Sequence, residues 1–221
     1  MKVKVYNLII IDESGSMSSI HKQAVDGLNE TLQSIQSAQK THKDLQEHFV
    51  TMVFFNTNGV RTIMENRPVD QIEMLQFKDF SPNALTPLYD AMGMNLSKLR
   101  YRLDENEKNQ VLVTIITDGE ENASKEYSGI MIKNMVKDLK ALGWVFAYIG
   151  ANQDVDQVAD SLSIDNRMCF EATCEGSEKM AKNLSKSTGR FYDKLSLSLF
   201  DEKIRSNLQS YFFDDEDEHS I

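Results

Sequence analysis

Oxygen-bearing side chains that could hold a metal ion are concentrated in three short segments of the sequence. The first, residues 12–16, directly follows an apolar stretch; the second contains Thr86; and the third contains Asp118, which ends another apolar stretch. Mg²⁺, Mn²⁺ and Ca²⁺ prefer oxygen ligands of this kind, whereas Zn²⁺ favours Cys and His. Convergence of the three segments would create a site for a Mg²⁺-class ion, with Mn²⁺ and Ca²⁺ as the alternatives. Its predicted ligands are Asp12, Ser14, Ser16, Thr86 and Asp118.

The sequence around these segments predicts an alternation of strands and helices. Residues 3–11 and 111–117 are almost continuously apolar, as strands are when helices cover both faces of a parallel sheet. Apolar residues at helical spacing follow in residues 16–40 and again from Pro87 onwards. Further strands are expected at residues 49–55, 60–65, 144–149 and 168–172, and further helices at residues 126–142, 155–162 and 177–187.

This alternation predicts an α/β fold, a three-layer sandwich with a doubly wound, mostly parallel sheet and one antiparallel edge strand. Residues 60–65 are the expected edge strand, because residues 56–59 have the composition of a tight turn. In open α/β sheets, ligands bind beyond the carboxyl ends of the strands, where the strand order reverses. Asp12 and Asp118 both end predicted strands, so both are expected at that edge.

The three segments together resemble the signatures of the von Willebrand factor A (vWA) family. Residues 12–16 (DESGS) resemble its DxSxS motif, residues 86–88 (TPL) its second element, and residues 117–120 (TDGE) its third. The resemblance covers roughly residues 1–190 and implies the Rossmann-like vWA fold with a metal-ion-dependent adhesion site. In such a site the two serines and the threonine coordinate the ion, and the two aspartates support it directly or through water. An Asp or Glu of a partner protein completes the coordination.

The loop before Thr86 departs from the family pattern. Many intracellular members carry glycines there, whereas residues 81–85 read SPNAL and contain none. Glycine readily adopts positive φ, and Pro82 instead restricts the chain. The sequence therefore leaves open whether Thr86 contacts the metal directly.

Three glutamates close to the predicted ligands are candidates to influence the metal or the choice of partner: Glu13, Glu120 and Glu121. For Glu120 and Glu121 the alternative is that they complement a helix dipole or are simply solvated. Asn152 and Asp154 also follow a predicted strand, and a role as a helix cap is the favoured interpretation there.

The composition narrows the class of function. The net charge is −10, which disfavours binding to nucleic acids and to anionic membranes, because both need clustered Lys and Arg. No stretch has the length and apolarity of a membrane span, and the N-terminal apolar run lacks the cleavage site of a signal peptide. Two cysteines are too few for a disulfide framework. The expectation is a cytoplasmic protein.

One domain with a short tail is the simplest organisation. We expect a vWA domain over residues 1–200 and an acidic, mobile C-terminal tail over residues 201–221, where residues 214–218 are all Asp or Glu. The four histidines show no metal-ligand spacing and are predicted at the surface.

Three functions fit these observations. The favoured one is a non-enzymatic, metal-dependent module that binds a carboxylate of another protein, and the family resemblance suggests an ATPase of the AAA+ class as a partner. The alternative is a metal-dependent phosphatase or hydrolase with Glu120 or Glu121 as general base. Against it, the sequence contains no P-loop and no nucleophile elbow, and Ser14 stands where haloacid dehalogenase-type phosphatases carry a second aspartate. The third is a structural subunit whose metal never meets a ligand.

Overall fold

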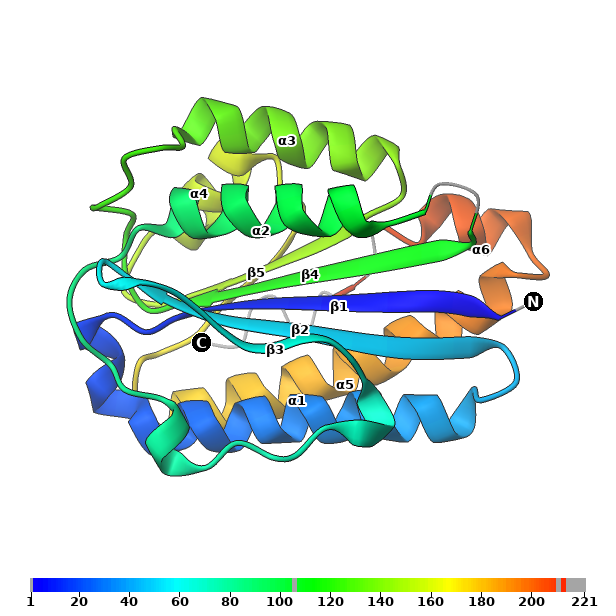
Figure 1. Cartoon of the computed structure of the whole chain (residues 1–221), viewed down its shortest axis with the longest axis horizontal. Helices are drawn as coiled ribbons and strands as arrows, with labels where there is room; N and C mark the ends of the chain where they lie inside the picture. The colour runs from blue at the N-terminus through cyan, green and yellow to red at the C-terminus, as the bar shows by residue number, and fades with distance from the viewer. Residues whose placement is uncertain (1, 105–106, 210–211, 214–221) are drawn as a thin grey trace.

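The computed structural model describes residues 2–104, 107–209 and 212–213, and within them a six-stranded sheet forms the centre of the molecule (Figure 1). The strand order is β3-β2-β1-β4-β5-β6, and every neighbouring pair is parallel except β2 with β3. The predicted fold class, including its single antiparallel edge strand, is confirmed. The strands are β1 (Val3–Asp12), β2 (Gln46–Asn56), β3 (Gly59–Pro68), β4 (Asn109–Thr117), β5 (Val145–Gly150) and β6 (Asn166–Cys169).

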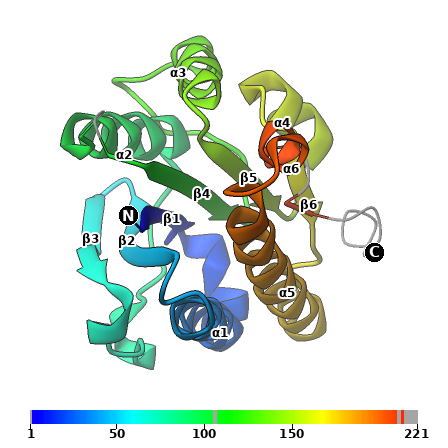
Figure 2. The same cartoon turned by 90° about the vertical axis from the view of Figure 1, so that its right-hand side faces the viewer.

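Helices cover both faces of the sheet and complete the three layers (Figures 1 and 2). One face carries α1 (His21–Thr41) and α5 (Cys174–Ser198), and the other carries α2 (Leu88–Arg102), α3 (Gly129–Ala141) and α4 (Val155–Leu162). A short helix α6 (Glu202–Asn207) follows α5, and short 3-10 helices occur at η1 (Gly15–Ile20), η2 (Val69–Gln71) and η3 (Phe77–Asp79). Among the described residues, no helix combines the length and apolarity needed to cross a membrane.

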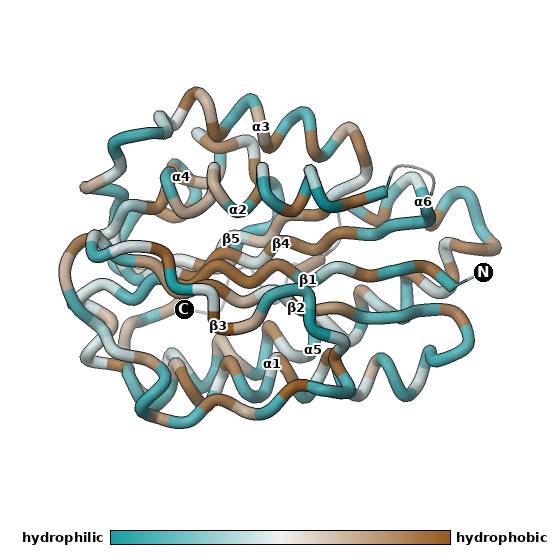
Figure 3. The backbone as a smooth tube through the Cα atoms, in the orientation of Figure 1, coloured by the Kyte–Doolittle hydropathy of each residue, from teal (hydrophilic) through white to brown (hydrophobic). Residues whose placement is uncertain are grey.

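Strand β1 shows why a continuous apolar run belongs at the centre of this sheet. Alternate side chains of a strand point to opposite faces. Ile9 and Ile11 are buried in the core beneath α1 and α5, whereas Leu8 and Ile10 are buried beneath α2 and α3. Each such side chain stabilises the fold by about 1.5–3 kcal/mol. Figure 3 shows the apolar residues gathered in the strands and on the inner sides of the helices.

Helix α3 begins at Gly129, three residues later than the sequence predicts. The side chain of Asp90, in the first turn of α2, accepts hydrogen bonds from the backbone N–H groups of residues 125, 126 and 127. These three N–H groups are therefore held in a loop instead of entering the helix. Asp90 thereby ties the loop that follows β4 to the start of α2.

The packed part of the chain continues beyond residue 200. Leu208, Phe212 and Phe213 are buried in the core on the α1–α5 side. The Asn166 side chain donates to the carbonyl of Gln209 and accepts from the backbone N–H of Phe212. The acidic run at 214–218 lies outside the described residues, so the mobile tail stays a prediction.

Candidate metal-binding site

The sheet order brings the first and third predicted segments together. From β1 the chain passes to β2 on one side, and after β3 it crosses the sheet to β4 on the other side of β1, so the strand order reverses between β1 and β4. Their register pairs Ile11 with Ile116 and leaves Asp12 beside Thr117. Thr117 Oγ1 donates to Asp12 Oδ2 over 2.7 Å. Asp12 and Asp118 are both buried at this edge.

Four of the five predicted ligands form one hydrogen-bonded chain. Asp12 Oδ1 accepts from the backbone N–H of Ser14 at 2.7 Å, which shapes the turn after β1. Ser14 Oγ lies 3.1 Å from Ser16 Oγ, and Ser16 Oγ donates to Asp118 Oδ1 over 2.6 Å. Ser14 precedes η1, yet among the described residues its hydroxyl caps no backbone N–H there. The arrangement therefore does not match the simpler interpretation of these serines as helix caps.

Thr86 reaches the same place from the loop before α2. A Cβ atom placed on Gly119 would lie 3.8 Å from Ser16 Oγ and 3.8 Å from Thr86 Oγ1, so both hydroxyls border the small space beside Gly119. The Asn122 side chain accepts from the backbone N–H of Thr86 at 3.0 Å, and the Asn122 N–H donates to the Thr86 carbonyl at 3.2 Å. Asn122 is not among the predicted site residues, because nothing local to its segment indicates that it meets Thr86.

The loop before Thr86 adopts positive φ without a glycine. Ala84 has φ 65°, in the left-handed region that residues with a Cβ rarely occupy. The neighbouring backbone holds it there: Gly15 N–H donates to the Ala84 carbonyl at 3.1 Å, and Asn83 N–H donates to the Glu13 carbonyl at 2.9 Å. The surrounding hydrogen bonds compensate for the strain, so the loop reaches positive φ although it contains no glycine.

The buried carboxylates of Asp12 and Asp118 are only partly stabilised by hydrogen bonds from the protein. Burial raises the pKa of the Asp12 carboxyl to about 6 and also raises that of Asp118, although hydrogen bonds from hydroxyls and from backbone N–H groups oppose both shifts. Asp118 Oδ2 is buried and has no hydrogen-bond partner among the described residues. A buried carboxylate oxygen without a partner is costly. A divalent cation held by hard oxygens would supply the missing compensation, so the donor set fits a Mg²⁺-class ion.

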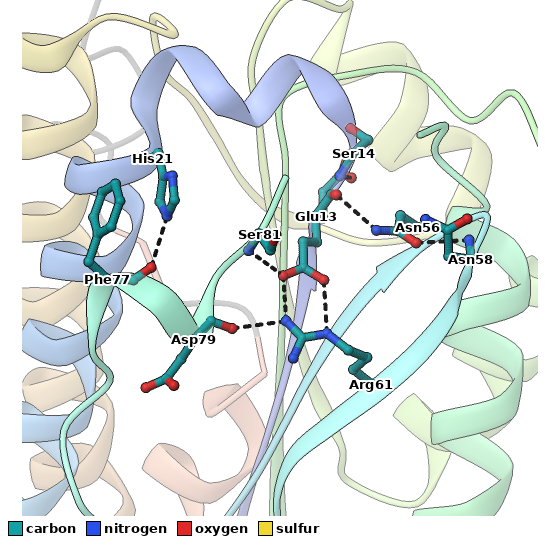
Figure 4. A network of polar contacts seen from close by, with 10 residues as sticks. Glu13, Ser14, His21, Asn56, Asn58, Arg61, Phe77, Asp79 and Ser81 are labelled. Atoms are coloured by element: carbon teal, nitrogen blue, oxygen red, sulfur yellow. Dashed lines mark hydrogen bonds and ion pairs between the residues drawn. The ribbon is translucent and has the colours of Figure 1, made fainter. Parts of the chain in front are cut away.

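The three predicted glutamates differ in their environments. Glu13 is buried and its carboxylate pairs with Arg61, as Figure 4 shows. Glu121 accepts from the backbone N–H groups of residues 89, 123 and 124 and from the Ser124 hydroxyl, so it braces the loop. Glu120 is exposed at the rim of the site.

Asp154 caps α4 by accepting from the Gln157 N–H, as predicted. Asn152 donates from its side chain to the Asp118 carbonyl at 3.1 Å, which adds a second support to the Asp118 loop. In the part of the chain that the structure describes, no three His, Cys, Asp or Glu side chains cluster as metal ligands would. The candidate site contributes two carboxylates and three hydroxyls instead.

Comparison with solved structures identifies the fold. A von Willebrand factor type A protein from Catenulispora acidiphila superposes with a TM-score of 0.55 over 85% of this chain, at 11% identity. The chain has a vWA-type fold. A scan against models of protein families and a search of curated protein sequences both found no match.

Two further vWA-type neighbours were solved with metal. Proximal thread matrix protein 1 from the mussel byssus, described with a zinc-occupied MIDAS motif, matches 84% of this chain with a TM-score of 0.55 and 13% identity. The manganese-loaded TRAP protein of Plasmodium vivax matches 80% with a TM-score of 0.53 and 17% identity. The chain covers 43% of the Catenulispora protein, 46% of the byssus protein and 70% of TRAP. It therefore spans less than half the length of the first two.

Proposed function

We propose that this vWA domain holds a divalent ion, Mg²⁺ in the first instance, and uses it to bind a carboxylate of a partner protein. The ligands are Asp12, Ser14, Ser16, Thr86 and Asp118. The observation that carries the proposal is the hydrogen-bonded chain from Asp12 through both serines to Asp118, which ends on a buried carboxylate oxygen without a partner among the described residues. The metals in the byssus protein and in TRAP support a divalent ion.

The ligand types favour binding over catalysis. Three of the five ligands are neutral hydroxyls, so a bound ion keeps much of its positive charge and attracts an incoming carboxylate. Ser16 is exposed, which leaves one side of the site open to a partner. The chain carries a net charge of −10, so an acidic partner must overcome a repulsive field. Removing the metal should therefore abolish binding instead of merely weakening it.

A metal-dependent hydrolase is the second candidate, and the glutamates argue against it. A hydrolase needs a general base within reach of a metal-bound water. Glu13 is paired with Arg61, and Glu121 is engaged by four hydrogen bonds, so neither is free to accept a proton. Glu120 remains as the exposed candidate. We infer a cytoplasmic binding module, with an AAA+ ATPase as the family-based candidate for its partner.

The test combines metal titration with affinity capture. Isothermal titration with Mg²⁺ should show a site that Asp12→Ala removes, while Asp26→Ala, an exposed aspartate on α1, should leave it unchanged. Capture from the native cell should recover a partner in Mg²⁺ and lose it in EDTA or with Asp12→Ala. Mg²⁺-dependent turnover of a phosphoester that disappears in Asp12→Ala would overturn the binding-module proposal in favour of the hydrolase.

A further inference from the structure

A glutamate between two of the proposed metal ligands has its carboxylate directed toward β3 instead of the ion. Glu13 follows Asp12 and precedes Ser14, and only 3% of its side chain is exposed. Its Oε1 and Oε2 accept from Nη2 and Nε of Arg61, at 2.5 and 3.2 Å. In Figure 4 the Glu13 carboxylate points at the Arg61 fork. Such a bidentate ion pair fixes the orientation of the two side chains as well as the distance between them.

Every polar group of Glu13 is used, and its partners come from three different segments. Its N–H donates to the Phe55 carbonyl at the end of β2, at 2.8 Å. Its carbonyl accepts from the Asn83 N–H at 2.9 Å and from the Asn56 side chain at 3.2 Å. Its carboxylate also accepts from the Ser81 N–H at 2.6 Å. Glu13 therefore joins residues 12–16, the first metal loop, to β2, to β3 and to the loop that leads to Thr86.

Arg61 connects the same loop from the other side. Its Nη2 donates to the Asp79 carbonyl at 2.9 Å, and its guanidinium lies 5.5 Å from the centre of the Phe54 ring. Further along, His21 stacks on Phe77 with the ring centres 3.8 Å apart. Residues 77–84 are thus held at several points before the chain reaches Thr86. These contacts together explain how the loop can hold Ala84 at positive φ.

We propose that Glu13 and Arg61 are positioning residues, which set the first metal loop and the Thr86 loop in the geometry that the ion requires. The proposal rests on the proposed metal site, but it concerns residues that do not touch the ion. A purely electrostatic account predicts the opposite result for one variant. Removing the positive charge of Arg61 leaves the Glu13 carboxylate unneutralised close to the cation, which by itself would tighten metal binding. If Arg61 positions the loops, its loss instead weakens metal binding.

The experiment measures the Mg²⁺ affinity of Arg61→Gln by isothermal titration in the full chain. Loss of a residue that orients metal ligands typically costs 10- to 100-fold, so we expect binding weaker by roughly 10-fold. Arg61→Lys keeps the charge but lacks the planar fork that donates to both carboxylate oxygens in parallel, so we expect an intermediate affinity. Arg67→Gln removes the same charge from an exposed position on the same strand and should match the wild type.

Hydrogen exchange of the metal-free protein provides a second readout that does not depend on metal binding. Arg61→Gln should speed exchange at the Ser81 and Asn83 amides, which Glu13 holds, whereas Arg67→Gln should not. Tighter or unchanged Mg²⁺ binding in Arg61→Gln, or unchanged exchange at these amides, overturns the positioning role. If the wild type binds no Mg²⁺, the proposed function fails. The exchange experiment still shows whether the Glu13–Arg61 pair holds the loop that leads to Thr86.

Discussion

Ser16 Oγ donates a hydrogen bond to Asp118 Oδ1 over 2.6 Å, although 102 residues separate the two in sequence. The bond uses one oxygen of a buried carboxylate and leaves the other, Oδ2, without a partner among the described residues. The apo protein therefore bears the cost of an incompletely paired buried charge at the point where a cation would remove that cost.

Replacing Asp118 with Asn should separate folding from metal binding. The Asn side chain can still accept from Ser16, and the buried charge of Asp118 is removed, so we expect the metal-free variant to be at least as stable as the wild type. At Mg²⁺ about 100-fold above its Kd, the wild type should gain about 2.7 kcal/mol, and the variant should gain nothing. Thermal denaturation with and without Mg²⁺ measures both effects. An Asp118→Asn variant that keeps the full Mg²⁺ gain would contradict the ligand assignment, and Asp26→Asn serves as the control.

Replacing Ala84 with Gly should stabilise the protein. The left-handed conformation at φ 65° costs a residue with a Cβ roughly 1–2 kcal/mol, and glycine adopts it freely. Greater freedom of glycine in the unfolded chain offsets about 0.4–1 kcal/mol of this gain. We expect a net increase of up to about 1 kcal/mol in the free energy of unfolding, measured by urea denaturation. Ala141→Gly, at the exposed end of α3, should instead lower stability, and a loss in both variants would argue against strain at Ala84.

His48 should make the fold sensitive to acid, contrary to the prediction that all four histidines lie at the surface. Its ring is buried, its Nε2 lies 2.8 Å from Gln46 Oε1, and its Nδ1 has no hydrogen-bond partner among the described residues. Burial and, to a smaller extent, the neighbouring His42 lower the pKa of His48 to about 3. The Tyr192 ring meets His48 edge-on with the centres 4.6 Å apart, and His42 in turn pairs with Asp193.

The sign of the pH effect follows from proton binding. Between about pH 6.5 and pH 3 the unfolded chain binds a proton on His48 that the folded chain does not, so stability falls as the pH falls through this window. At pH 5 the loss relative to pH 7 should be about 2 kcal/mol from this residue. The Asp12 carboxyl acts in the opposite direction, so the comparison is with His48→Gln, which should show a correspondingly smaller loss. Equal losses in the two proteins would exclude His48 as the source.

Two truncations test where the folded domain ends. Ending the chain at residue 200 removes Phe212 and Phe213, which are 1% and 4% exposed, and a buried Phe contributes about 3–5 kcal/mol. We expect this truncation to lower the free energy of unfolding by several kcal/mol. Removing only residues 214–221 should leave it unchanged if the acidic run is a mobile tail. Denaturant unfolding of the two truncated chains distinguishes a boundary at 200 from one near 213.

The sequence by itself determined the layers and the edge at which the site lies. Apolar runs in residues 3–11 and 111–117 can only be covered by helices on both faces, and a residue that ends such a strand lies at the carboxyl edge of the sheet. The placement of Asp12 and Asp118 therefore follows from local pattern. The order of DxSxS, Thr86 and Asp118 segments then indicated the vWA fold, which the structural comparison shows.

Only the tertiary structure decided how the loops contact one another. The direction of Glu13 toward Arg61, the pairing of Asn122 with Thr86 and the positive φ of Ala84 all depend on groups far away in sequence. His48 lies on the same face of β2 as Val50 and Met52, but the predicted strand began at residue 49, and only the packing of Tyr192 from α5 shows that its ring is covered. Residue type and spacing report the preferences of one segment, whereas these contacts depend on which segments the sheet register and helix packing bring together.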